Sequence, residues 1–132
     1  MSGRLILDHF RNPRNSGFIE QADGLGIEKE NPWMIAIQVS LKVREGTIQE
    51  IKFKAQGCVT AIACASMMTE TVRGQTVEKA LSVSHQELSE ALGTVPEEKL
   101  HCCRLAISAL HKAIEDYLMA QVRDSVLVGS GN

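Results

Sequence analysis

Two cysteines and one histidine have the types and placement to bind a metal ion or to handle sulfur. Cys58 follows a strand-like run through Gly57, and Cys102 stands beside His101 where the last helix is expected to begin. A thiol at a helix N-terminus meets unpaired amides and the positive end of the helix dipole, which lower its pKa toward the thiolate. Thiolate and imidazole together suit zinc or iron–sulfur chemistry.

The other two cysteines are predicted to be core residues. Cys64 lies on the apolar stripe of its helix, and Cys103 is one residue, about 100° of helix rotation, from Cys102. The two adjacent thiols therefore face different ways. Cys103 shares its stripe with Ile107, Leu110 and Ile114. Cys102 shares its own stripe with Leu105, Ala106, Ala109 and Ala113, and these smaller residues leave room for close approach. Cys58 alone would equally suit a small apolar residue in a strand-to-helix turn.

Strands are expected before these thiols and helices after them. Apolar and polar residues alternate over 35–43 and again over 51–55, with Glu45-Gly46 as the turn between two strands. Helical periodicity dominates after Gly57, which predicts an α+β fold with helices packed on one face of a small antiparallel sheet. We expect helices at 4–10, 58–73, 76–81, 84–92 and 101–123, and a flexible turn at 23–26.

The composition indicates one ordinary domain, at residues 1–123, followed by a flexible tail at 124–132. The 132 residues are 44% hydrophobic but only 4% aromatic, so the core should be aliphatic. A net charge of −2 gives no reason to expect nucleic acid or an anionic membrane as a partner. No apolar stretch approaches the roughly 20 residues of a membrane span, and no secretion signal is evident. We therefore expect a cytoplasmic location with reduced thiols.

Three longer motifs occur in order along the chain. They are the segments 7–15, 53–66 (which contains the Gly57-Cys58 pair) and 99–102, which reads Lys-Leu-His-Cys. The chain thereby resembles the U-type iron–sulfur cluster assembly scaffolds, the family of IscU and of the N-terminal domain of NifU, from about residue 5 to 118. The resemblance implies a three-stranded antiparallel sheet packed with helices and a long C-terminal helix.

The resemblance also implies a scaffold and carrier rather than an enzyme. Such a protein would assemble a [2Fe–2S] cluster transiently, from iron and from sulfur delivered by a cysteine desulfurase, and hand it to recipient apo-proteins. Cys58, His101 and Cys102 would bind the cluster or iron, and Cys102 would accept persulfide sulfur. Three such ligands could also hold zinc with water in the fourth place.

The chain departs from the family pattern at two places. Family members carry Cys-Gly-Asp just after an Asn-Pro pair, whereas Asn31-Pro32 is followed here by Trp33-Met34-Ile35-Ala36. The first cysteine and the aspartate are therefore absent. Residues 95–99 read Val-Pro-Glu-Glu-Lys where scaffolds served by a dedicated Hsp70-type chaperone carry Leu-Pro-Pro-Val-Lys, which places that partner in doubt.

A cluster normally takes four protein ligands, so a fourth is needed here. It could come from Cys103, from Cys64 after a local shift, from a carboxylate such as Glu28 or Glu30, or from a second molecule. Three hypotheses remain open. The chain is a variant scaffold that still binds metal or a cluster, or a sulfur-transfer or adaptor paralogue that docks on the desulfurase without holding one, or a degenerate paralogue kept as a binding module.

Overall fold

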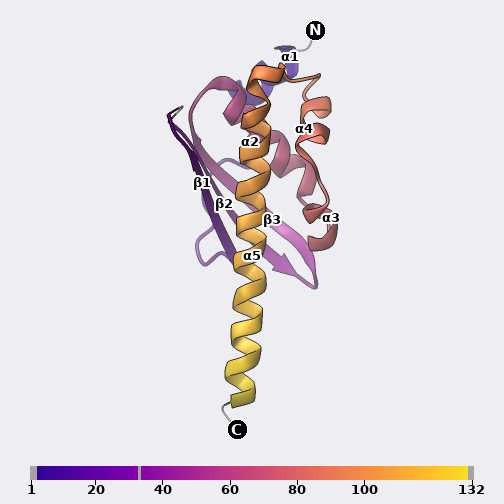
Figure 1. Cartoon of the computed structure of the whole chain (residues 1–132). Coiled ribbons are helices and arrows are strands. Elements are labelled where there is room, and N and C mark those ends of the chain that lie inside the picture. Colours follow the sequence, from indigo (N-terminus) through magenta and orange to yellow (C-terminus); the bar gives the residue numbers. More distant parts are fainter. Residues whose placement is uncertain (1–2, 33, 131–132) are drawn as a thin grey trace.

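A three-stranded antiparallel sheet forms one layer of the structure, and helices cover one of its faces (Figure 1). The computed structural model describes residues 3–32 and 34–130. The strands β1 (Gly24–Glu30), β2 (Ile35–Arg44) and β3 (Thr47–Gln56) lie in the order β1-β2-β3. The predicted hairpin is thus β2 and β3, and its register places Val39 opposite Phe53.

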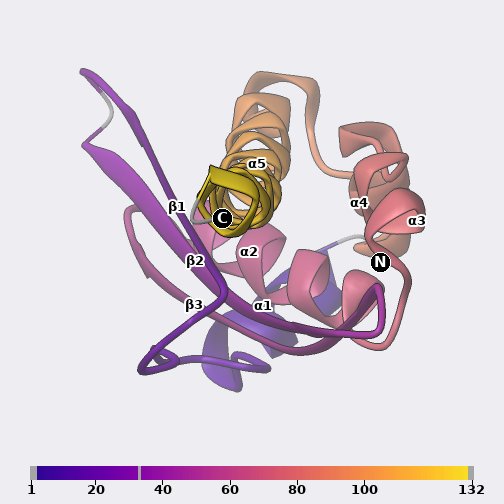
Figure 2. The same cartoon turned by 90° about the horizontal axis from the view of Figure 1, so that it is seen from below.

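The helices follow the strands along the chain, with one exception at the start. They are α1 (Gly3–Arg11), α2 (Val59–Val72), α3 (Val77–Leu81), α4 (His85–Ala91), the 3-10 turn η1 (Glu97–Lys99) and α5 (Leu100–Ser130). Seen from below, α5 and α2 lie side by side in the hollow of the curved sheet, with α3 and α4 beyond them (Figure 2). This confirms the predicted α+β architecture.

The core lies between the sheet and the helices α2 and α5. Alternate residues of β2 from Ile35 to Leu41 are buried toward the helices, as the sequence pattern predicts. Aliphatic side chains predominate among the largest fully buried ones, which include Ile37, Leu41, Ile48, Ile51, Leu110 and Ile114. The predicted aliphatic core is therefore present, and it holds α2 and α5 firmly on the sheet.

The first strand replaces the flexible turn that was expected at residues 23–26. Gly24 pairs with Leu41, and both Gly24 and Gly26 are buried against α5. A Cβ atom on Gly26 would overlap the backbone of Ala109 and Ala113. The glycines are there because the α5 backbone approaches β1 directly, and the small α5 residues provide the room that their stripe predicted.

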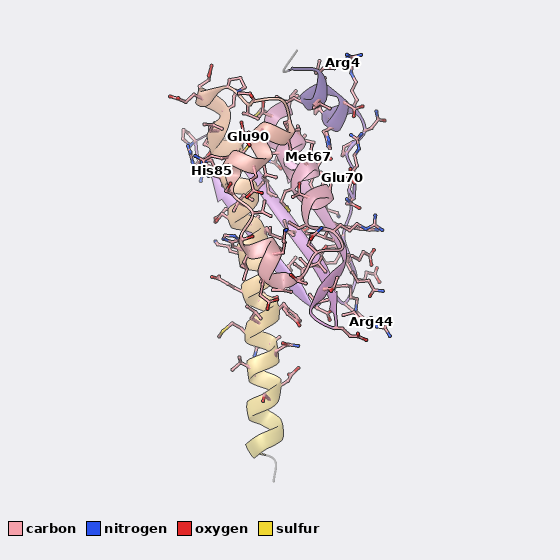
Figure 3. The ribbon with its side chains drawn as sticks, turned by 90° about the vertical axis from the view of Figure 1, so that its right-hand side faces the viewer. Arg4, Arg44, Met67, Glu70, His85 and Glu90 are labelled. Carbon is pink, nitrogen blue, oxygen red and sulfur yellow. The ribbon has the colours of Figure 1, made fainter. Side chains whose placement is uncertain are left out.

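The helix ends follow their capping residues. Ser84 and Glu87 form the predicted capping box at the start of α4. The helix α5 passes its predicted end at Arg123 and continues to Ser130. The end of α5 extends past the sheet (Figure 3). The flexible tail at 124–132 stays a prediction, and residues 131 and 132 lie outside the described part.

Candidate functional site

The thiols of Cys58 and Cys102 meet where α2 and α5 begin. The two helices start at the same end of the molecule (Figure 1), and the two Sγ atoms are 3.8 Å apart. Cys58 is the N-cap of α2. The preceding Gly57 has a φ of +148°, a backbone conformation that residues with a side chain rarely adopt. Cys58 is partly exposed and Cys102 is buried. The structure thus brings together the two thiols that the sequence singled out.

His101 connects this thiol pair to the end of β1. Its Nε2 atom is 3.9 Å from the Sγ of Cys102, and its Nδ1 atom is 2.5 Å from Oε1 of Glu30. The His101–Glu30 contact was not predicted, although Glu30 was considered as a fourth ligand. The residues beside Glu30 gave no signal for this contact, since its partner lies 71 positions away in the sequence. The four side chains form a row: Cys58, Cys102, His101, Glu30.

The pKa of Cys102 contradicts the expectation from its place at a helix start. Burial raises the pKa of the Cys102 thiol to about 12, and the neighbouring Cys58 adds to the rise. Cys102 is fully buried, and the 3-10 turn η1 runs directly into α5 ahead of it. The loss of solvent therefore outweighs the helix dipole and the nearby positive charge of Lys99.

The other two cysteines form a second, deeper pair between the same helices. Cys64 of α2 and Cys103 of α5 are fully buried, as predicted, and their Sγ atoms are 2.9 Å apart. The hydrogen bond between them, together with burial, raises the pKa of Cys64, and the same hydrogen bond lowers that of Cys103. Sequence patterns predicted the burial of each residue but not their meeting.

The carboxylate of Glu28 holds β1 to α5 further along. Its Oε2 atom accepts a hydrogen bond from the hydroxyl of Ser108 at 2.5 Å, and its Oε1 atom forms an ion pair with the Nζ of Lys112 at 3.2 Å. The hydrogen bond from Ser108 is the main reason that the pKa of Glu28 is lowered. Glu28 therefore already has two partners in this structure, whereas Glu30 contacts the candidate ligand His101 itself.

The ligand candidates fit a metal ion only in part. Across residues 3–32 and 34–130, no three histidine, cysteine or acidic side chains are arranged to hold one. Met34 stands in the β1–β2 connection, 67% exposed and with a φ of +59°. Trp33 lies outside the described residues. Cys58, Cys102 and His101 are close neighbours that would have to converge on a metal.

In the part of the chain that the structure describes, no helix is both long and apolar enough to cross a membrane.

The model of the NifU-like N-terminal domain family matches residues 2–124. The iron–sulfur cluster assembly scaffold protein IscU 1 of Archaeoglobus fulgidus is 45% identical over 112 residues, which are 85% of this chain and 73% of that protein. The IscU scaffold protein of Aquifex aeolicus is 42% identical over 120 residues, 89% of this chain and 76% of the relative.

A solved structure agrees on the fold. The N-terminal part of a NifU-like protein from Brucella abortus superimposes with a TM-score of 0.71 at 16% identity, and covers 88% of this chain and 93% of that one. It too belongs among the folds with a small sheet and packed helices that the resemblance implied. The chain belongs to the NifU-like N-terminal domain family, together with the IscU scaffold proteins.

Proposed function

We propose that this chain is a variant iron–sulfur cluster assembly scaffold that accepts sulfur on Cys102 and holds iron or a nascent [2Fe–2S] cluster at Cys58, His101 and Cys102. The observation that carries the proposal is the meeting of these three side chains at one end of α2 and α5, with contacts of 3.8 and 3.9 Å. Thiolate and imidazole ligands suit iron–sulfur chemistry. The chain acts as a carrier, and it catalyses no reaction of its own.

The family membership supports two kinds of partner. A cysteine desulfurase would deliver the sulfur, and recipient apo-proteins would take the finished cluster. The partly exposed Cys58 is the thiol of the pair that solvent reaches, so the site can exchange its cargo there. We place the protein in the cytoplasm, where its four cysteines would stay reduced.

The proposed site has three protein ligands, and no fourth ligand is in place among the residues that the structure describes. Cys103 is directed at Cys64, and Glu30 is directed at His101. A released Glu30 carboxylate, Cys103 after a local shift, or a thiol of a second molecule would complete the set. Three protein ligands with water in the fourth place would still hold zinc, so zinc is measured along with iron.

Anaerobic reconstitution tests the proposal. The reduced full chain is incubated with ferrous iron and sulfide, desalted, and analysed for iron, zinc, sulfide and visible absorption. We expect a stoichiometric metal or a cluster absorption band that Cys102→Ala and His101→Ala abolish. His111→Gln is the matched control, because His111 lies on the same helix but about 15 Å further along its axis.

A protein that stays colourless and metal-free under these conditions would overturn the scaffold proposal. If mass spectrometry then found persulfide on Cys102 after treatment with a desulfurase and L-cysteine, the chain would be a sulfur-transfer protein. Retention of metal by Cys102→Ala at the level of His111→Gln would show that the ligands lie elsewhere.

A further inference from the structure

A second pair of thiols lies directly inside the site. The Sγ atoms of Cys64 and Cys103 are 2.9 Å apart, which is shorter than a van der Waals contact of two sulfur atoms and longer than the roughly 2.05 Å of a disulfide bond. Both side chains are fully buried between α2 and α5. A small movement of the two sulfur atoms toward each other would reach the length of a disulfide bond.

The four thiols form one group on two helices. Cys103 follows Cys102 directly in α5, and Cys64 lies in the second turn of the helix that Cys58 caps. Each helix contributes one thiol to the outer pair and one to the inner pair, and the Sγ atoms are 3.8 Å apart in the outer pair and 2.9 Å apart in the inner pair. The inner pair is therefore within reach of sulfur chemistry at the outer pair.

Cluster assembly needs electrons at this place. Sulfur carried as a persulfide is in the sulfane state, whereas the bridging atoms of a cluster are sulfide. Each sulfur must gain two electrons, and two thiols that join as a disulfide release two electrons. A buried dithiol beside the sulfur acceptor has the right capacity and the right position for this step.

We propose that Cys64 and Cys103 are an internal dithiol that reduces the sulfur on Cys102 to sulfide and becomes a disulfide. This inference rests on the proposed acceptance of sulfur by Cys102. The oxidant is the sulfane sulfur itself, so no other oxidant is needed. Thiol–disulfide exchange passes the disulfide from the inner pair to the outer pair, where an external dithiol reductant reaches the partly exposed Cys58 and restores all four thiols before the next round.

The reaction proceeds in two exchanges. The Sγ of Cys103 attacks the outer sulfur of the Cys102 persulfide, the S–S bond of that persulfide breaks, and Cys102 leaves as a thiol with the proton of Cys103. The Sγ of Cys64 then attacks the Sγ of Cys103, and the outer sulfur leaves as hydrogen sulfide with the proton of Cys64. One persulfide and two thiols become one thiol, one disulfide and one hydrogen sulfide.

The burial of the pair explains why this reaction would be specific. Bulk oxidants and low-molecular-weight disulfides cannot approach two fully buried sulfur atoms. A sulfur atom added to Cys102 lengthens that side chain by about 2 Å, and Cys103 is attached to the neighbouring backbone position. The inner pair therefore responds to sulfur that is already on the protein.

Sulfide release from loaded protein tests the inference. The fully reduced chain is loaded anaerobically in two parallel arms, one with a cysteine desulfurase and L-cysteine and the other with glutathione persulfide, and then separated from the donor by rapid gel filtration. Released sulfide is trapped by alkylation, and disulfides are located by peptide mass mapping. We expect about one sulfide for each persulfide loaded, together with a disulfide between Cys64 and Cys103.

Three variants define the result. Cys64→Ser and Cys103→Ser should each keep the added sulfur on the protein, with no disulfide and at least a tenfold loss of sulfide release. Ala61→Ser is the matched control, because it puts a hydroxyl on the same buried side of α2 and keeps all four thiols. It should behave as the wild type. Circular dichroism verifies that each variant is folded.

Each possible failure points to one proposal. If Cys102 is loaded in both arms and the wild type keeps its persulfide, or Cys64→Ser releases sulfide as fast as the wild type, the internal dithiol is overturned and the scaffold proposal stands. If only glutathione persulfide loads Cys102, and the Cys64–Cys103 disulfide then forms, acceptance of sulfur from a desulfurase is overturned and the internal dithiol stands.

Discussion

The Nδ1 atom of His101 lies 2.5 Å from Oε1 of Glu30, although 71 positions separate the two residues. The contact joins the end of β1 to the first turn of α5 and leaves the Nε2 atom 3.9 Å from the Sγ of Cys102. A carboxylate that holds one imidazole nitrogen fixes the ring and the nitrogen that is offered to a metal. Glu30 is therefore a positioning residue for His101.

Removal of this carboxylate should weaken metal binding. We expect Glu30→Ala to lower the affinity for zinc about 10- to 100-fold, the usual loss when the partner of a ligating histidine is removed. Glu30→Gln should lose less, because its amide oxygen still accepts a hydrogen bond from Nδ1. Competition of the protein with a chromophoric chelator for zinc, at one pH, measures both.

Glu28→Ala is the matched control for Glu30→Ala. Glu28 lies on the same strand and also contacts α5, through Ser108 and Lys112. Its removal loosens the same helix–strand contact without touching His101. Equal losses of zinc affinity in the two variants would mean that zinc binding depends on the contact between β1 and α5 and not on the contact between Glu30 and His101.

Local patterns predicted each sulfur site but not the contacts between sites. The helix starts near Cys58 and Cys102, and the burial of Cys64 and Cys103, follow from the residues beside each cysteine. The two thiol pairs depend on how α2 crosses α5, and a local pattern does not contain that geometry. The pKa of Cys102 was predicted in the wrong direction for the same reason, since its burial comes from distant elements.

The first strand shows a different limit of the sequence. Alternation identifies a strand only through side chains, and Gly24 and Gly26 have none on the face that α5 covers. The segment consequently has the composition of a turn. Its pairing with β2 and its contact with the backbone of α5 make it a strand, and the family resemblance alone had implied a third strand.

The close approach of β1 and α5 should make Gly26 intolerant of a side chain. The added methyl group of Gly26→Ala would overlap the backbone of Ala109 and Ala113, so α5 would have to move away from the sheet. We expect the free energy of unfolding in urea to fall by about 1–3 kcal/mol. Gly3→Ala is the control, because a Cβ there meets nothing within 4 Å. A loss of stability in Gly3→Ala as large as that in Gly26→Ala would contradict this account.

The end of α5 should contribute little to stability. Residues 121–125 are all exposed, and the helix extends past the sheet at its end (Figure 3). We expect a chain that stops after Arg123 to keep its free energy of unfolding within about 0.5 kcal/mol of the full chain. Fast amide exchange in residues 124–130 of the full chain would support the predicted flexibility of the tail. A loss several times larger on truncation would place these residues in the folded domain.

His9 should make the fold sensitive to mild acid. Its side chain is buried, and its Nδ1 is 2.8 Å from the hydroxyl oxygen of Ser66 in α2. Burial lowers the pKa of His9, and the charge of Arg14 adds to the effect. The unfolded chain therefore binds this proton more readily than the folded one, so the free energy of unfolding should fall as the pH drops below about 6.5.

Urea unfolding at a series of pH values between about 7 and 5 measures this dependence. His9→Gln should flatten it, because glutamine does not titrate. Asp8 does not interfere, since its hydrogen bond with Arg14 lowers the pKa of its carboxyl group further from this pH range. An unchanged slope in His9→Gln would assign the acid sensitivity to another group.

A thiol at position 34 should restore part of the missing ligand set. Met34 is 67% exposed in the β1–β2 connection, directly before Ile35, which pairs with Glu30. Since Glu30 contacts His101, residue 34 lies near the candidate ligands, at the end of the sheet where β1 ends and β2 begins. We expect Met34→Cys to retain a reconstituted cluster at least several times longer than the wild type in the presence of a chelator, because a cluster normally has four protein ligands.

Met34→Ser separates the thiol from the change in size. Serine has nearly the shape of cysteine but cannot supply a thiolate, so it removes any shielding by methionine without adding a ligand. If the absent thiol limits cluster retention, only Met34→Cys will slow the loss of absorption. Equal retention in both variants would instead mean that the bulk of Met34 controls access to the site, and that Cys58, His101 and Cys102 hold the cargo with ligands other than residue 34.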